Sequence, residues 1–157
     1  MRQLLLVFAC LLPSSSGLAE TRVGQVVSIV DGDTLVLQVE RRRHQVRLVG
    51  IDAPERVQSF GAHARANLGR LAFQRQATAD CPPRAAVGPS PCKVLVAGQD
   101  IGLRQLADGM AWRDAGTQTP EDAAAYQQAE MLAKLRRLGL WSEAHPTPPW
   151  NWRKLLR

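Results

Sequence analysis

Three short stretches rich in β-branched residues follow one another near the start of the chain. Residues 23–30 (VGQVVSIV) end at Asp31-Gly32, a pair that is typical of tight turns between strands. Residues 34–39 (TLVLQV) follow with strand-like alternation, and residues 45–50 (QVRLVG) come after a basic connection, ERRRH. Residues 52–55 (DAPE) follow after Ile51 and include a proline, which cannot continue a central strand. The pattern therefore predicts a three-stranded antiparallel meander that ends at DAPE.

The spacing of apolar residues changes from strand-like to helical after this meander. In chain order, the pattern predicts an amphipathic helix at 61–75, strands at 76–79 and 92–97, a short helix at 100–108 and a long helix at 119–139. Thr119 is the expected N-cap of the long helix. Five short strands with a helix between the third and the fourth favour an α+β fold that is mainly β. We expect a five-stranded Greek-key barrel of the oligonucleotide/oligosaccharide-binding (OB) type with three helices.

The first 19 residues have the layout of a secretory signal peptide: a basic residue, an apolar run, and small residues ending at Ala19. The run is too short for a permanent membrane span. Cys10 is compatible with a lipoprotein cleavage site, although ordinary secretion is the preferred interpretation. We expect a signal peptide at 1–19, one domain around one core at 20–153, and a basic tail at 154–157. The mature protein is expected to be a secreted or periplasmic monomer without a membrane anchor.

Basic residues outnumber acidic residues in the chain that remains after this cleavage. Removal of Arg2 leaves 19 of the 20 Lys and Arg residues against 14 Asp and Glu, an excess of 5 positive charges. Such an excess suits a polyanionic partner such as DNA or RNA. A basic exported protein without such a partner has the same composition, so charge alone leaves both interpretations open.

Cys81 and Cys92 remain as an even pair once Cys10 is removed. They stand at the expected end of the fourth strand and the start of the fifth, where they can face one another. In an exported domain such a pair predicts a disulfide, and two buried free thiols are the alternative. The bridge would close the proline-rich segment 81–92 into a loop.

Two acidic turns flank the second and third strands of the meander. Asp33 precedes the second strand and Asp52 follows the third, and antiparallel neighbours bring such positions together, with Glu55 nearby. Taken singly, each turn is an ordinary feature of a loop. Together, carboxylates that converge repel one another unless a cation neutralises them, and oxygen ligands favour Ca²⁺ or Mg²⁺ over zinc.

Arg47 lies in the third strand, five residues before Asp52, so it can project beside the acidic cluster. A guanidinium next to a carboxylate-bound cation can neutralise charge on a phosphodiester. The alternative is a structural ion pair between Arg47 and one of the carboxylates.

Several segments together resemble the staphylococcal nuclease (thermonuclease-like) family: VDGDTLVL, VRLVGIDAPE, the helix that follows, GQDIGLRQLADGMAW, AAYQQAEMLAKLRRLGLW and PPWNWR. The resemblance runs from about residue 23 to residue 153. It implies an OB-fold barrel with three helices, and Ca²⁺-dependent hydrolysis of DNA and RNA phosphodiesters that leaves 3′-phosphates.

The resemblance also implies roles for individual residues. Asp33 and Asp52 match the calcium-binding carboxylates, and the backbone carbonyl of Ala53 takes the place of a third ligand. Asp31 matches an acidic residue behind these ligands. Glu55 matches the proposed general base for the attacking water, and Arg47 matches the first of two phosphate-binding arginines.

The chain departs from the family at the second of these arginines. The corresponding stretch reads AAVGP (85–89), so Pro89 stands at the arginine position. A phosphate-clamping arginine can contribute roughly 10³-fold or more to phosphoryl transfer. Two functions therefore stay open: a Ca²⁺-dependent nuclease in which another cation replaces the arginine, or an OB-fold nucleic-acid-binding module that keeps the metal site and cleaves poorly.

The loop between the cysteines offers a candidate for the replacement. Arg84 is its cation, and Lys93 directly follows Cys92. One hypothesis is that the bridge presents Arg84, or alternatively Lys93, toward the phosphate. The alternative is a disulfide-stabilised surface excursion without a catalytic role.

Overall fold

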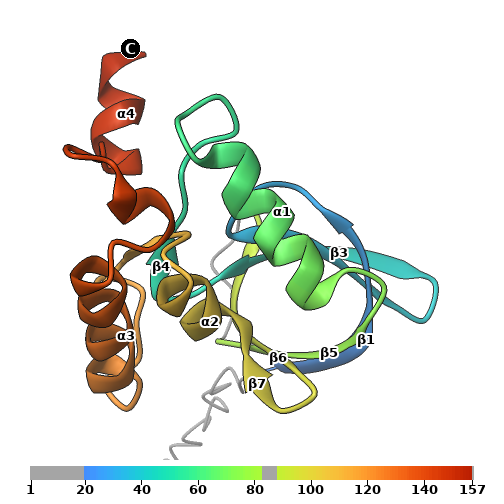
Figure 1. The fold of residues 1–157 in the computed structure, drawn as a ribbon. Coiled ribbons are helices and arrows are strands. Elements are labelled where there is room, and N and C mark those ends of the chain that lie inside the picture. Colours follow the sequence, from blue (N-terminus) through green and yellow to red (C-terminus); the bar gives the residue numbers. More distant parts are fainter. Residues whose placement is uncertain (1–19, 83–87, 157) are drawn as a thin grey trace, which may run out of the picture.

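Five strands form a closed barrel in the structure, a computed structural model that describes residues 20–82 and 88–156. They are β1 (Glu20–Ile29), β2 (Thr34–Val39), β3 (Arg42–Leu48), β5 (Gln76–Cys81) and β6 (Ser90–Val96). β1, β2 and β3 form the expected antiparallel meander, and β5 pairs antiparallel with both β1 and β6. Parallel pairing of β3 with β6 closes the barrel. The prediction of a mainly β, OB-type fold is confirmed (Figure 1).

Three two-residue strands lie outside the barrel wall. β4 (Ile51–Asp52) pairs with β8 (Trp112–Arg113), and β7 (Gln99–Asp100) extends the sheet beside β6. The β4–β8 pair ties the segment after the meander to the chain that follows α2 (Ile101–Ala107).

The described residues contain four α-helices where the sequence predicted three. They are α1 (Gly61–Ala72), α2, α3 (Ala123–Leu135) and α4 (Pro149–Leu155), with a 3₁₀ helix, η1 (Gly139–Ser142), before α4. The additional helix is α4, in a segment whose prolines suggested irregular structure. Pro149 stands at the first position of α4, where a helix needs no N–H donor, so this proline starts the helix and does not break it. α4 also continues past residue 153, across the predicted start of the basic tail.

Most elements differ from the sequence prediction by a few residues at their ends, and the starts of α3 and β3 differ for identifiable reasons. α3 starts at Ala123, so Thr119 is not its N-cap; the Thr119 hydroxyl instead donates a hydrogen bond to Asp122 Oδ2 at 3.0 Å. β3 starts at Arg42 because the hairpin needs only two loop residues, with Glu40 at φ 54°. Most of the basic connection is therefore strand.

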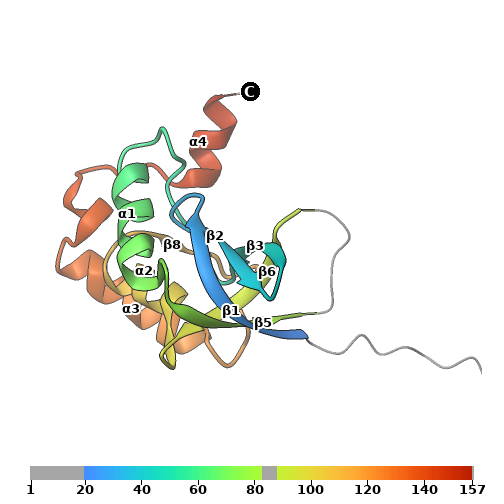
Figure 2. The same ribbon diagram turned by 90° about the vertical axis from the view of Figure 1, so that its right-hand side faces the viewer.

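The core fills the barrel and extends beneath α1 and α2. Leu35, Leu37 and Val46 from the meander pack in one buried cluster with Leu68 of α1 and Leu106 of α2. Figures 1 and 2 show α1 and α2 together on one side of the strands. This packing places the β1–β2 turn and the segment after β4 at the same end of the barrel as α1.

A disulfide joins Cys81 at the end of β5 to Cys92 in β6, with a Cα–Cα distance of 4.2 Å. The predicted pairing is therefore present. Arg84 belongs to residues 83–87 and lies outside the described residues, as do the predicted signal peptide 1–19 and residue 157. Among the helices of 20–82 and 88–156, none has the length and apolar character needed to cross a membrane.

Candidate active site

The turn between β1 and β2 carries Asp31 and Asp33, and the shape of this turn depends on Gly32. The Asp33 N–H donates to Asp31 Oδ1 at 3.1 Å, which holds the two acidic residues on one tight bend. A Cβ atom at Gly32 would lie 2.6 Å from the Ala64 Cβ and 2.7 Å from the Ala53 Cβ. Real Cβ atoms do not approach so closely, so the turn packs against α1 and the segment after β4 only because residue 32 is glycine.

A buried amide from α2 fastens this turn to the helices. Gln105 is fully buried, and its Nε2 donates to the Gly32 carbonyl at 2.6 Å and to the Ala64 carbonyl at 3.1 Å. Asn67 of α1 donates to Gln105 Oε1 at 2.5 Å. Sequence reasoning missed this network, because the residues around Gln105 (LRQLAD) do not distinguish a buried glutamine from an exposed one.

Arg47 contacts both of the aspartates that were predicted to bind a metal. Its Nη2 lies 3.3 Å from Asp33 Oδ2 and 2.9 Å from Asp52 Oδ1. The Ala53 N–H also donates to Asp33 Oδ2, at 3.0 Å. Asp33 and Asp52 are buried, whereas the Arg47 side chain is partly exposed. The structure thus contains the ion pair that was the alternative for Arg47, at the place where the phosphate-binding hypothesis also puts this residue.

Burial raises the pKa of Asp33 to about 6, against the lowering effect of the Arg47 guanidinium and the Ala53 N–H. The nearby Asp31 carboxylate adds to the rise. A nearby cation stabilises the ionised form of such a buried carboxyl group, so the site favours the binding of further positive charge.

A second arginine enters the site from the far end of the chain. Arg153 of α4 places Nη2 at 2.7 Å from Asp52 Oδ2 and Nη1 at 2.8 Å from Glu55 Oε1. Nη1 is also 3.2 Å from Asp52 Oδ1. Hydrogen bonds to Asp52 and Glu55 raise the pKa of Arg153 against the opposing effect of burial. Sequence reasoning assigned no role to Arg153, although PPWNWR was among the segments that carried the family resemblance.

These residues line a hollow of about 460 Å³, called the acidic hollow below. Among the residues that the structure describes, its charged side chains are four carboxylates and two guanidinium groups: Asp31, Asp33, Asp52, Glu55, Arg47 and Arg153. Four negative and two positive groups leave a formal charge of −2, which one divalent cation would balance.

The donor set fits a hard cation. Asp33 and Asp52 offer carboxylate oxygens and the Ala53 carbonyl is adjacent, whereas zinc sites usually include sulfur or imidazole ligands. No group of three or more His, Cys, Asp or Glu side chains placed to hold a metal occurs in 20–82 and 88–156. A cation at Asp33 and Asp52 would therefore take its remaining ligands from backbone carbonyl and water, which Ca²⁺ and Mg²⁺ both accept.

Two further residues from the sequence analysis have clear positions. Pro89, at the expected arginine position, lines the acidic hollow. Lys93 does not, because its Nζ pairs with Asp122 at 2.6 Å and with Asp100 at 3.6 Å. The hypothesis that Lys93 replaces the arginine is therefore wrong.

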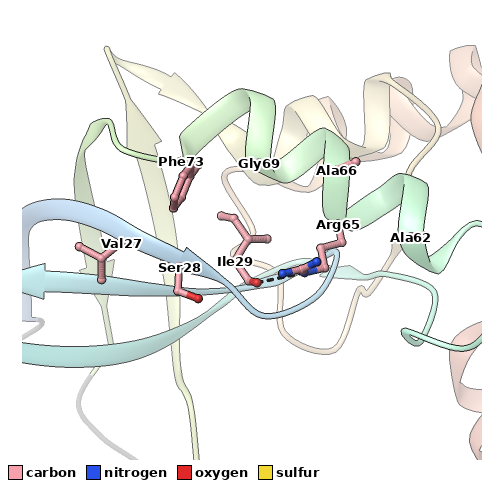
Figure 3. A pocket seen from close by; sticks show the side chains of 8 residues that line it. All are labelled: Val27, Ser28, Ile29, Ala62, Arg65, Ala66, Gly69 and Phe73. Atoms are coloured by element: carbon pink, nitrogen blue, oxygen red, sulfur yellow. Dashed lines mark hydrogen bonds between the residues drawn. The ribbon is translucent and has the colours of Figure 1, made fainter.

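A second hollow, of about 480 Å³, lies between β1 and α1 (Figure 3). Its lining is mainly apolar and includes Val27 and Phe73. Arg65, its charged residue, donates from Nε to the Ile29 carbonyl at 3.1 Å. No carboxylate, histidine or cysteine is among the described residues that line this hollow, so it lacks the groups that the predicted chemistry needs.

Comparisons with known proteins point to one family. The family model for staphylococcal nuclease homologues matches residues 45–143. The chain is 36% identical over 140 residues to micrococcal nuclease of Shigella flexneri, covering 83% of this chain and 80% of that protein. It is 34% identical over 157 residues to the protein ParB of Escherichia coli, covering 93% and 86%. It is 34% identical over 152 residues to an uncharacterized endonuclease of Haemophilus influenzae, covering 96% and 82%. With its OB-type barrel and a family match over more than half its length, the chain belongs to the staphylococcal nuclease family.

Proposed function

We propose that this protein is an exported, Ca²⁺-dependent nuclease that hydrolyses phosphodiester bonds of DNA or RNA. The observation that carries the proposal is the convergence of Asp33, Asp52, Glu55 and Arg47 on one hollow. The names of two relatives, a micrococcal nuclease and an endonuclease, support the same reaction class.

Asp33, Asp52 and the Ala53 carbonyl would hold the cation in this proposal. When bound, Ca²⁺ supplies positive charge that polarises the phosphate and offsets the negative charge that develops on it. The Asp33 carboxylate is already fixed, because the Ala53 N–H and the Thr34 hydroxyl, at 2.7 Å, each donate to it. Asp33 would therefore need little reorganisation, whereas a cation at Asp52 would displace part of the arginine contacts on its two oxygens.

Glu55 is the proposed general base. Its backbone N–H donates to Gln58 Oε1 at 3.1 Å, so the start of the loop is held while the carboxylate faces the hollow. A carboxylate beside the phosphate can accept the proton of an attacking water. Arg47 contacts both aspartates through the single nitrogen Nη2, which leaves the rest of its guanidinium for a phosphate oxygen.

Pro89 supports a second candidate function. Because this residue offers no charge where the resemblance expects an arginine, the protein could bind nucleic acid through the barrel and cleave it poorly. Retention of Asp33, Asp52, Glu55 and Arg47 together favours the nuclease, since a binding module has no need for a general base.

Export is part of the proposal. The signal-peptide pattern of residues 1–19 predicts a secreted or periplasmic protein, and the Cys81–Cys92 disulfide suits an oxidising compartment.

The proposal predicts chelator-sensitive cleavage and a calcium response that depends on Asp52. Purified protein lacking residues 1–19 should cleave single-stranded DNA or RNA with Ca²⁺, and excess chelator should stop the reaction. Ca²⁺ should also raise the melting temperature of the wild type, because it binds only the folded site. Asp52→Ala should abolish both effects, since it removes a carboxylate that would hold the cation.

Glu121→Ala is the matched control, because Glu121 is an exposed carboxylate outside the acidic hollow. That variant should keep the full calcium response. An unchanged response in Asp52→Ala would refute the metal site, and binding without cleavage at every metal concentration would favour the binding module.

A further inference from the structure

We propose that Arg153 is a second phosphate-binding residue of the acidic hollow, so that α4 supplies the cation that position 89 lacks. The inference rests on the proposed function and extends it to a residue 101 positions away from Asp52 in the chain. Arg153 lies beyond the part of the chain matched by the family model, which ends at residue 143.

The first argument is position. Arg153 and Pro89 line the same hollow, and the Arg153 guanidinium lies at the proposed general base, with Nη1 2.8 Å from Glu55 Oε1. A phosphate placed for attack by a Glu55-bound water would have to lie within reach of this guanidinium. Arg47 is on the same hollow, also bonded to Asp52, so the two arginines would contact a phosphate together.

The second argument is that the Arg153 contacts can be exchanged for a phosphate. Its side chain is 40% exposed, and it contacts Asp52 and Glu55 through its two terminal nitrogens, Nη1 and Nη2. A planar guanidinium has five N–H donors in a fork that matches phosphate oxygens as well as carboxylates. The Glu55 contact is a single hydrogen bond to a carboxylate that is itself 37% exposed, so this contact is the one that a phosphate can replace at low cost.

The third argument is that α4 is held against the segment that carries Glu55. Gln58 Nε2 donates to the Thr147 carbonyl at 2.5 Å, and Ser59 forms a hydrogen bond with Glu143. Trp150 packs edge-on to Trp112 at 6.4 Å between ring centroids. Figures 1 and 2 both place α4 beside the chain between β4 and α1. Contacts from both sides of this junction fix the helix, and with it the place from which Arg153 reaches the hollow.

The fourth argument is charge. Counted over 20–82 and 88–156, the acidic hollow with Arg153 has a formal charge of −2, so a bound divalent cation balances these groups. Without Arg153 the same hollow would have a formal charge of −3, and the loaded site would remain negative. A negative site repels a phosphodiester, so the second guanidinium favours the approach of an anionic substrate.

The test compares Arg153→Gln with Lys154→Ala in the protein that lacks residues 1–19. Lys154 is the next residue on α4, is exposed and does not line the hollow, so its removal controls for loss of one positive charge. We expect Arg153→Gln to lower kcat/KM for single-stranded DNA by about 10²–10³-fold, as loss of a transition-state donor does. Lys154→Ala should stay within about threefold, as expected for an exposed charge away from the site.

A rescue separates phosphate binding from support of the fold. Pro89→Arg, introduced into Arg153→Gln, should recover at least about tenfold in kcat/KM, because it returns a guanidinium to the same hollow. If Arg153→Gln melts below the assay temperature, Arg153→Lys keeps the charge without the fork and is measured in its place. Absence of rescue together with a lowered melting temperature would mean a structural role only and would overturn the inference.

Binding gives a readout that does not depend on turnover. In a Glu55→Gln background with Ca²⁺, Arg153→Gln should weaken affinity for the same oligonucleotide at least about tenfold, and Lys154→Ala should not. Unchanged affinity and unchanged kcat/KM in Arg153→Gln would overturn the inference. Increased cleavage would also overturn it, because it would mean that Arg153 inhibits the enzyme by blocking the carboxylates of Asp52 and Glu55. If the wild type cleaves nothing with any divalent cation, the proposed function fails, yet the binding comparison still decides the role of Arg153.

Discussion

Glu55 differs from Asp33 and Asp52 in its access to solvent. The Asp33 and Asp52 side chains are 8% and 7% exposed, whereas the Glu55 side chain is 37% exposed. Buried carboxylates that share one guanidinium nitrogen suit a fixed cation, because their oxygens cannot turn away to water. A carboxylate at the rim can receive a proton from water and release it again. Burial therefore supports the proposed roles of Asp33 and Asp52 as holders of a cation and of Glu55 as the base.

Glu55→Gln should leave the fold intact and lower kcat by about 10²–10⁴-fold, the usual contribution of a general base. The amide keeps the size of the side chain and can still bond Arg153, but it cannot accept a proton. The measurement is kcat with Ca²⁺ together with the melting temperature, and Glu121→Gln serves as the exposed control. Turnover near that of the wild type would exclude Glu55 as the base.

The β1–β2 turn shows how elements cooperate to place the acids. The turn is short, and its Gly32 fits between Ala53 of the segment after β4 and Ala64 of α1. Gln105 of α2 bonds the carbonyls of Gly32 and Ala64. Three elements thus meet at one glycine, and a shift of any of them would separate Asp33 from Asp52.

Gly32→Ala should destabilise the fold by about 1–3 kcal/mol, the usual cost of overpacking a well-packed site. Cleavage should fall as well, because relief of the clash displaces the turn that carries Asp33. The free energy of unfolding in denaturant and kcat/KM measure the two effects.

Gly69→Ala in α1 is the matched control, because a Cβ there would meet only Ile29 Cγ1 at 4.0 Å. This helical glycine should tolerate alanine and gain about 0.5–1 kcal/mol. Equal behaviour of the two variants would contradict the packing argument at Gly32.

At the scale of the whole molecule, the barrel is closed by contacts between distant parts of the chain. β3 pairs in parallel with β6, the strand that carries Cys92, and the disulfide ties β6 to the end of β5. The acidic hollow likewise combines the meander with Pro89 before β6 and Arg153 at the C-terminal end. Stability of the closed barrel and assembly of the hollow are therefore linked.

Loss of the disulfide, by Cys81→Ala with Cys92→Ala, should cost about 2–3 kcal/mol in the loop-entropy model. The bridge spans a sequence separation of 11 residues, so its effect on the unfolded chain is moderate. Below the melting temperature kcat should change little, because neither cysteine lines the hollow. Unfolding in denaturant with and without reductant measures the difference.

Mass spectrometry of peptides prepared without reductant checks that the disulfide forms in the protein. It should find the Cys81–Cys92 pair in protein folded under oxidising conditions. Two free thiols, or equal stability with and without reductant, would contradict this prediction.

Local sequence patterns were sufficient for the meander and for the acids that it carries. Strand alternation and the Asp31-Gly32 turn predict which residues pair, and antiparallel pairing then brings Asp33 toward Asp52, 19 positions later. The same logic placed Arg47 and the two cysteines, because each lies in or beside a predicted strand. The family resemblance added the roles of Glu55 and the Ala53 carbonyl, which spacing alone does not imply.

Only the tertiary structure decided which cations and amides surround these acids. Arg153 reaches Asp52 because α4 packs against the chain near Gln58, and no local signal relates residues 101 positions apart. Lys93, adjacent to the disulfide, was excluded from the hollow by ion pairs with Asp100 and Asp122. Gln105 became buried through the packing of α2, which its own spacing does not reveal. Hydrogen bonds within a hairpin follow from sequence order, whereas side-chain partners across the molecule follow from how helices dock on the barrel.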